Sequence, residues 1–201
     1  GNVYSLAIDN GQKLWVGASD VYWYKPTDGQ RAIVNYTLLA DREGDFDHVV
    51  KVNYLSDVLT KPVDDLTEEN EEEFGNDGAL IEDMWIGGNY LNVQFRFYLP
   101  SHYRHRVSLV KNTTVEDPED GYIHLEYRYN NQDDVTNVWT RSFVSFYLGD
   151  YAPGKAADEY KGIIVKINPT INGEKKLKYE FKKSEGNDRT ITKLEEFNTT
   201  E

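Results

Sequence analysis

The densest group of chemically active side chains is a run of carboxylates near the middle of the chain. Residues 64–83 contain ten Asp or Glu and no Lys or Arg, and seven of these acids lie between positions 64 and 73. Such a run creates a strong local negative potential, which attracts cations and basic proteins. The candidate binding residues in it are Asp64, Asp65, Glu68, Glu69, Glu71, Glu72 and Glu73.

Two roles for this acidic run are compatible with its sequence. Calcium loops need roughly six to eight oxygen ligands, commonly from acids at alternate positions around a sharp glycine turn. Glu71, Glu72 and Glu73 are consecutive, so they do not fit an EF-hand loop. The run can be a docking strip for a basic partner, or a solvated connecting stretch that self-repulsion keeps extended.

Aromatic side chains are the second candidate group. The chain has 27 Phe, Trp and Tyr residues, of which 15 are Tyr. Exposed Trp and Tyr bind sugars or peptides because they combine a large rigid ring with a polar group. Trp23 and Tyr103 are the aromatic residues that we predict for binding; the alternative is that such residues pack at the seam between two domains.

The sequence contains none of the common catalytic patterns. It has no cysteine, which excludes disulfides, thiolate ligands and a Cys nucleophile. His102 and His105 lie between two predicted strands without a third zinc ligand, and Ser145 lies in a strand pattern without a G-x-S-x-G motif. We therefore predict a non-enzymatic protein with no catalytic residue, no metal site and no cofactor.

The elements that must position these residues are predicted to be strands. Apolar and polar residues alternate with a period of two over residues 90–99, 122–129 and 175–181, which is typical of a strand with one exposed face. Residues 139–148 are apolar on both faces, which indicates a central strand. After the acidic run we expect strands near residues 80–86, 90–99, 104–111, 122–129, 138–148, 162–168, 175–182 and 190–197. This spacing favours an immunoglobulin-like β-sandwich.

The chain before the acidic run favours a small barrel of the OB type. We expect five strands, near Tyr4–Asp9, Lys13–Val16, Asp20–Lys25, Arg31–Ala40 and Asp47–Leu59. Pro62 is predicted to end the last strand, because proline has no N–H for the ladder. The predicted organisation is therefore an all-β chain with an OB-type barrel over 1–62, an acidic connecting stretch over 63–79 and a β-sandwich over 80–201.

Several segments together resemble the NigD-like family of bacterial envelope proteins. They lie in the same order along nearly the whole chain: Asp28-Gly29-Gln30-Arg31, Val34-Asn35-Tyr36-Thr37, Lys51-Val52-Asn53, Asp57-Val58-Leu59-Thr60-Lys61-Pro62, Trp85-Ile86-Gly87-Gly88-Asn89-Tyr90-Leu91-Asn92 and Asp120-Gly121-Tyr122-Ile123-His124-Leu125-Glu126. The resemblance implies an N-terminal OB domain and a C-terminal β-sandwich. It also implies a periplasmic or outer-membrane-anchored lipoprotein and a role related to bacteriocin immunity.

The charge of the chain limits its partners. The net charge is −13, from 22 basic and 35 acidic residues, so the chain as a whole repels nucleic-acid phosphates and anionic membranes. Gly1 stands where an initiator Met would, which leaves room for a removed N-terminal segment carrying a lipid anchor. We expect a binding protein whose partner is an envelope protein or glycan, with membrane attachment only through such an anchor. The sequence does not define the oligomeric state.

Overall fold

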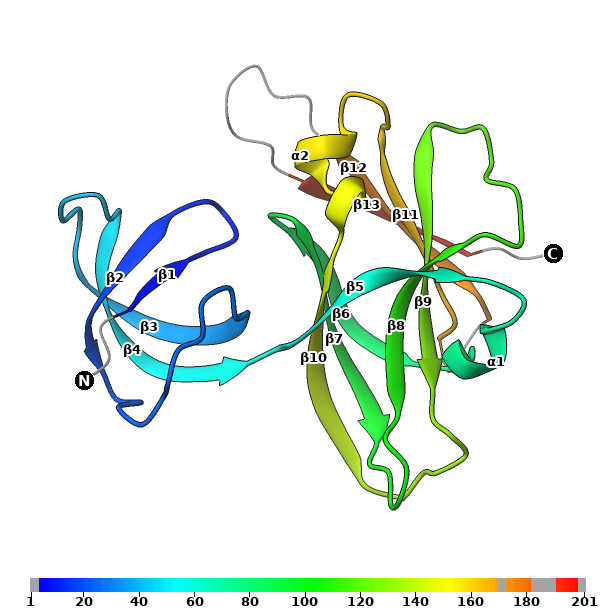
Figure 1. The fold of residues 1–201 in the computed structure, drawn as a ribbon, viewed down its shortest axis with the longest axis horizontal. Coiled ribbons are helices and arrows are strands. Elements are labelled where there is room, and N and C mark those ends of the chain that lie inside the picture. The colour runs from blue at the N-terminus through cyan, green and yellow to red at the C-terminus, as the bar shows by residue number, and fades with distance from the viewer. Residues whose placement is uncertain (1–3, 170–172, 182–190, 199–201) are drawn as a thin grey trace. The chain divides into compact units, whose positions relative to one another are not determined.

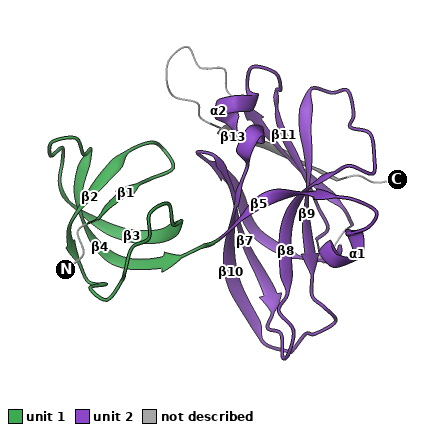
Figure 2. Ribbon diagram, in the orientation of Figure 1, with its two compact units in different colours: residues 1–59 green, residues 60–201 purple. Residues whose placement is uncertain are grey.

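The computed structural model describes residues 4–169, 173–181 and 191–198, and strands dominate these ranges (Figure 1). The chain divides into two compact units, Gly1–Leu59 and Thr60–Glu201 (Figure 2). No helix in the described ranges is long and apolar enough to cross a membrane. The prediction of an all-β chain is confirmed.

Unit 1 is a curved sheet whose described strands follow the order β1-β2-β4-β3. These are β1 (Ser5–Ala7), β2 (Lys13–Ser19), β3 (Ala32–Ala40) and β4 (His48–Asp57). The central pair, β2 and β4, is parallel, and each is flanked by an antiparallel neighbour. Leu14, Val50 and Val52 on the central pair are fully buried, so the period-two pattern of β4 directs its valines inward.

The predicted strand Asp20–Lys25 is wrong, because these residues form a turn. The Tyr24 N–H donates to the Val21 carbonyl oxygen over 3.0 Å and closes the turn around Tyr22 and Trp23. Val21 is buried, whereas Tyr22 and Trp23 are 84% and 65% exposed. Aromatic residues favour strands only where a neighbouring strand and a packed face receive them, and this segment lies in no ladder.

The next strand, β5 (Leu59–Leu66), continues through Pro62, so the expected break at this proline is also wrong. The register of β5 with β8 begins at Val63, opposite Leu109, so Pro62 stands directly before the first residue of this ladder. A proline at that position removes no hydrogen bond from the ladder. Residues 63–66, which we assigned to a connecting stretch, are thereby part of the unit 2 sheet.

Unit 2 is built around a single continuous sheet that curls around one core. Within the described residues its order is β13-β12-β11-β9-β8-β5-β10-β7-β6. The remaining strands are β6 (Leu80–Gly87), β7 (Tyr90–Tyr98), β8 (Arg106–Asn112), β9 (Tyr122–Asn130), β10 (Trp139–Tyr147), β11 (Gly162–Ile167), β12 (Lys175–Phe181) and β13 (Ile191–Asn198). The pairs β5–β8 and β9–β11 are parallel.

The core of unit 2 is formed by one face of nearly every strand. Leu91 and Val93 of β7, Leu125 of β9, Phe146 of β10 and Ile163 of β11 are buried in the same apolar cluster. Short helices lie outside the sheet: α1 (Glu71–Phe74) precedes β6, and η1 (Gly149–Tyr151) with α2 (Pro153–Ala156) follows β10. The curled sheet therefore leaves a second face outside the core, and α1 covers part of it.

Candidate functional site

The candidate site is an acidic strap, which we define as residues 64–78: the end of β5, helix α1 and the turns on either side. It lies over the outer surface of β8 and β9 in unit 2. Leu66 and Phe74 of the strap are buried together with Val110 of β8 in a small apolar cluster separate from the main core. Two apolar side chains therefore anchor a segment that is otherwise mostly acidic.

An ion pair and a cation–π contact extend this anchor at α1. The guanidinium of Arg106 lies 4.5 Å from the centre of the Phe74 ring and also pairs with the Glu73 carboxylate. Arg106 thus contacts both the apolar and the acidic side of the helix. Of the predicted binding residues, Glu73 pairs with Arg106, and Glu71 lies 4.0 Å from Arg128.

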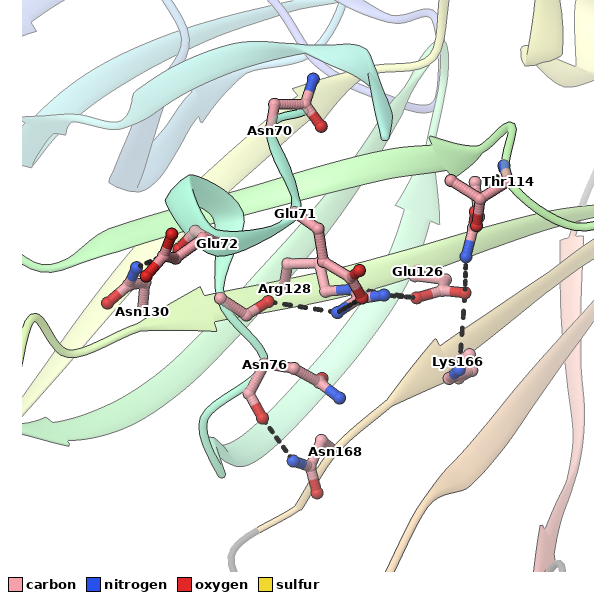
Figure 3. A network of polar contacts seen from close by, with 12 residues as sticks. Asn70, Glu71, Glu72, Asn76, Thr114, Glu126, Arg128, Asn130, Lys166 and Asn168 are labelled. Atoms are coloured by element: carbon pink, nitrogen blue, oxygen red, sulfur yellow. Dashed lines mark hydrogen bonds and ion pairs between the residues drawn. The ribbon is translucent and has the colours of Figure 1, made fainter. Parts of the chain in front are cut away.

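Backbone hydrogen bonds hold the strap at further points. The Asn130 side-chain amide donates to the carbonyl oxygens of Glu72 and Glu73, at 3.2 and 3.1 Å (Figure 3). After α1 the chain turns at Gly75, which has a φ of 64° and lies so close to Asn130 that a Cβ atom would be 2.8 Å from its side chain. Only glycine accommodates both the positive φ and this close approach.

A buried ion pair lies beneath the strap. Glu126 and Arg128 are neighbours on the outer face of β9, and each residue is less than 9% exposed. The Arg128 Nε donates to Glu126 Oε2 over 2.8 Å, and a second guanidinium nitrogen lies 2.6 Å from the same oxygen. Arg128 also donates to the Gly75 carbonyl oxygen over 3.3 Å, which ties the strap to the pair (Figure 3).

The other oxygen of the Glu126 carboxylate also has partners. The Asn112 amide donates to Glu126 Oε1 over 3.0 Å, and Lys166 Nζ lies 3.4 Å from this atom. Burial by itself would raise the pKa of Glu126, but the Asn112 hydrogen bond and the charges of Arg128 and Lys166 outweigh it and lower the pKa. Glu126 is therefore held as a carboxylate, and the pair is a fixed electrostatic anchor.

Most of the carboxylates of the strap point to solvent. Asp65, Glu68, Glu69, Glu71 and Glu72 are exposed, whereas Asp64 is half-buried. The structure therefore brings the predicted acidic residues together on one ordered segment, with their charges outward and their backbone tethered. The alternative of an extended connecting spacer does not describe this segment, because hydrophobic anchoring and hydrogen bonds outweigh its self-repulsion.

The two predicted aromatic residues lie in different units. Trp23 lies in the exposed turn of unit 1, where its ring contacts that of Tyr22 at 4.9 Å between centres. Tyr103 lies in the loop between β7 and β8 of unit 2 and is 65% exposed. Trp23 and Tyr103 therefore belong to different compact units.

Asp134 organises the loop that carries Tyr103. Its carboxylate accepts hydrogen bonds from the backbone N–H groups of Ser101, His102 and Tyr103 and from the Ser101 hydroxyl. These bonds, led by that of the Ser101 hydroxyl, hold the pKa of Asp134 far below its usual range.

Ser101, His102 and Asp134 do not form a catalytic triad. In a triad the imidazole lies between the hydroxyl and the carboxylate, whereas here the carboxylate contacts the hydroxyl directly. Among the described residues, no three His, Asp or Glu side chains are placed to hold a metal ion. The hydrogen bonds of Asp134 hold the loop of residues 101–103 in place.

These features define a two-domain β protein whose second domain presents an anchored acidic surface. The N-terminal part matches the NigD-like N-terminal OB domain over residues 1–58, and the C-terminal part matches the NigD-like C-terminal beta sandwich domain over residues 62–188. The chain belongs to the NigD-like family. The predicted resemblance and the prediction of an OB domain followed by a β-sandwich are both confirmed.

Two solved structures similar to this chain come from Bacteroides species. A protein of unknown function DUF1344 from Bacteroides vulgatus ATCC 8482 is 34% identical with a TM-score of 0.84, and the alignment covers 97% of this chain and 88% of that one. A NigD-like immunity protein from Bacteroides caccae ATCC 43185 is 17% identical with a TM-score of 0.61, covering 100% and 92%. At 17% identity, the similarity to the Bacteroides caccae protein shows a shared fold and nothing further. A search of curated proteins returns no significant match.

Proposed function

We propose that this chain is a non-enzymatic binding protein of the bacterial cell envelope with an immunity-type role. In this proposal the acidic strap docks a basic region of a protein partner. The observation that carries it is the anchoring of the strap. Six exposed carboxylates, of which Glu73 pairs with Arg106, stand on a segment fixed by Phe74, Asn130 and the buried Glu126–Arg128 pair. Membership of the NigD-like family, in which a similar fold is named an immunity protein, supports the biological role.

Anchoring of the strap reduces the loss of conformational entropy on binding. A flexible acidic tail loses conformational entropy when it docks, whereas a strap that is already ordered loses much less. Its concentrated charge also accelerates the encounter with a basic partner and disfavours acidic ones. Binding at the strap should therefore be fast and should weaken as salt screens the carboxylates.

The test is a charge-neutralised strap compared with a matched control. The strap variant carries Asp65→Asn, Glu68→Gln, Glu69→Gln, Glu71→Gln and Glu72→Gln. The control variant removes the same charge from exposed loop residues elsewhere: Asp28→Asn, Glu43→Gln, Asp45→Asn, Glu116→Gln and Glu119→Gln. Each protein is used to capture partners from envelope extract and from culture supernatant of bacteriocin-producing strains.

We expect a basic protein to be retained by the wild type and the control and lost by the strap variant, with an unchanged melting temperature in all three. A partner that the strap variant retains fully would reject the strap as the docking surface. The envelope location is tested separately, by fractionating cells that express the full precursor and by labelling with palmitate. Recovery of the protein in the cytosol without label would contradict the location.

A further inference from the structure

A second surface of unit 2 has a different chemistry from the strap. Val93 and Phe95 of β7 and Val144 and Phe146 of β10 are buried in the core, so the residues between them point to the outer surface. Strands β6, β7 and β10 lie side by side there (Figure 1). We name this outer surface the aromatic face.

Aromatic pairs mark the two ends of this face. Tyr98 and Trp139 are register partners whose ring centres lie 4.0 Å apart, and Tyr90 and Tyr147 are register partners with ring centres 5.4 Å apart. Trp139 and Tyr147 are 45% and 42% exposed. They stand eight residues apart on one strand, which corresponds to about 27 Å at roughly 3.4 Å per residue.

Aromatic and polar side chains share the space between the aromatic pairs. Phe143 and the 38% exposed Trp85 lie on this face, and beside them Asn92 and Ser145 are buried and hydrogen-bonded to each other.

The Glu82 carboxylate of β6 pairs with Arg96 of β7 and with Arg141 of β10, and it accepts a hydrogen bond from the Gln94 amide over 2.6 Å. A guanidinium has five N–H donors, and one carboxylate cannot occupy those of both arginines. The middle of the face therefore offers donors to a further ligand.

The charges of this face are balanced, in contrast to the rest of the chain. Arg96 and Arg141 offset Glu82 and Asp83, whereas the whole chain carries −13. A balanced face favours neither an anionic nor a cationic ligand. Its combination of exposed rings and planar hydrogen-bonding groups matches the two surfaces of a sugar: the rings cover C–H faces and the polar groups bind hydroxyls.

We infer that the aromatic face binds an uncharged glycan, in the form of an extended oligosaccharide rather than a single sugar. The length between the aromatic pairs exceeds a single ring. This inference does not depend on the proposed function, since it uses other residues on another surface.

The experiment is affinity electrophoresis of the full chain in native gels that contain dextran, laminarin, mannan, xylan or anionic alginate. The test variants are Trp139→Ala and Tyr147→Ala. The matched control is Tyr54→Ala, which removes an exposed ring from unit 1. Isothermal titration with oligosaccharides of increasing length then measures how many sugar units contribute.

We expect at least one neutral polysaccharide to retard the wild type and the Tyr54→Ala control equally. Each test variant should lose about tenfold in affinity, the effect of one stacked ring, and affinity should rise with chain length until the oligosaccharide spans both aromatic pairs. The charge-neutralised strap variant should bind the glycan like the wild type. Three results would each overturn the inference: no retardation by any neutral polysaccharide, retardation by alginate alone, or an equal loss of affinity in the Tyr54→Ala control.

Discussion

The acidic strap and the aromatic face are each organised by a carboxylate with the same kinds of partners. Glu126 binds an arginine, a lysine and an asparagine amide, and Glu82 binds two arginines and a glutamine amide. The cations differ in exposure: the Arg128 side chain is 5% exposed, whereas those of Arg96 and Arg141 are 46% and 50% exposed.

This difference separates an anchor from a binding surface. Buried charges have lost their water, so each depends on its partner and the set resists rearrangement. Exposed charges keep water as an alternative partner, so their pairing contributes little to stability and can be exchanged for a ligand. Identical chemistry therefore stabilises the fold at β9 and remains available for recognition at β6, β7 and β10.

The largest change in stability is expected when the buried cation, Arg128, is removed. Arg128→Ala leaves Glu126 as a buried carboxylate without its main partner and frees the Gly75 carbonyl oxygen. We expect the free energy of unfolding to fall by about 3–5 kcal/mol, as for other broken buried pairs. Urea denaturation followed by tryptophan fluorescence measures it.

The control for Arg128→Ala is the double variant Glu126→Leu with Arg128→Met, which replaces both charges by apolar groups. It should recover most of the lost stability, because no buried charge remains unpaired. A loss below about 1 kcal/mol in Arg128→Ala would show that water reaches Glu126 and that the pair behaves as an exposed one.

A somewhat smaller effect is expected from the apolar anchor of the strap. Phe74→Ala deletes a buried ring and its contact with Arg106. The expected loss is about 3 kcal/mol, at the lower end for buried Phe, because the small cluster can close partly around the space. Hydrogen exchange should accelerate at residues 67–78 and remain unchanged in β7; uniform acceleration would contradict a local anchor.

The pH dependence of stability sharpens the comparison further. Both Glu126 and Glu82 have pKa values below the usual 4.5, that of Glu82 at about 2, held there first by the Arg141 hydrogen bond. Below pH 4.5 each of these carboxyl groups is protonated in the unfolded chain but still ionised in the folded chain. The unfolded chain therefore binds more protons, and acid favours unfolding. Stability that is present above pH 4.5 should therefore be lost as the pH falls through the two folded pKa values.

The variants Glu126→Gln and Glu82→Gln assign that loss. Each should flatten the acid limb of a plot of unfolding free energy against pH, and Glu82→Gln should do so down to about pH 2. An acid limb that is identical in the wild type and both variants would mean that neither carboxylate is specifically paired in solution.

The smallest change in stability is expected on the aromatic face. Arg141→Gln should leave the urea midpoint nearly unchanged, because the guanidinium is half exposed. The same substitution should raise the pKa of Glu82 from about 2, since it removes the first cause of the lowering. Carboxyl NMR titration measures this shift; an unchanged pKa would show that Gln94 and Arg96 hold the Glu82 carboxylate without Arg141.

Much of the fold is predictable because it depends on local patterning. Alternation along residues 122–129 correctly places Glu126 and Arg128 on the face opposite Leu125 and Tyr127. The antiparallel strands β6 and β7 are joined by the two-residue turn Gly88-Asn89, a local feature of the chain. Side-chain direction in a strand follows from the period of two, so a single sequence suffices for it.

The errors arise where a residue's role depends on distant neighbours. Pro62 is compatible with β5 because its ladder with β8 begins one residue later, and the Trp23 segment is a turn because no strand pairs with it. The burial of Glu126 and Arg128 depends on a strap more than 50 residues earlier in the chain. No local signal in β9 distinguishes this buried pair from an exposed one.

The sequence by itself determined the all-β class, the two-part organisation, the concentration of charge before residue 83 and the face to which each strand residue points. The tertiary structure alone decided that the acidic run is an anchored strap, that Glu126 and Arg128 are buried, and that Glu82, Arg96 and Arg141 meet between two aromatic pairs. The physical reason is that backbone geometry repeats locally, whereas desolvation and charge pairing depend on which distant segments cover a side chain.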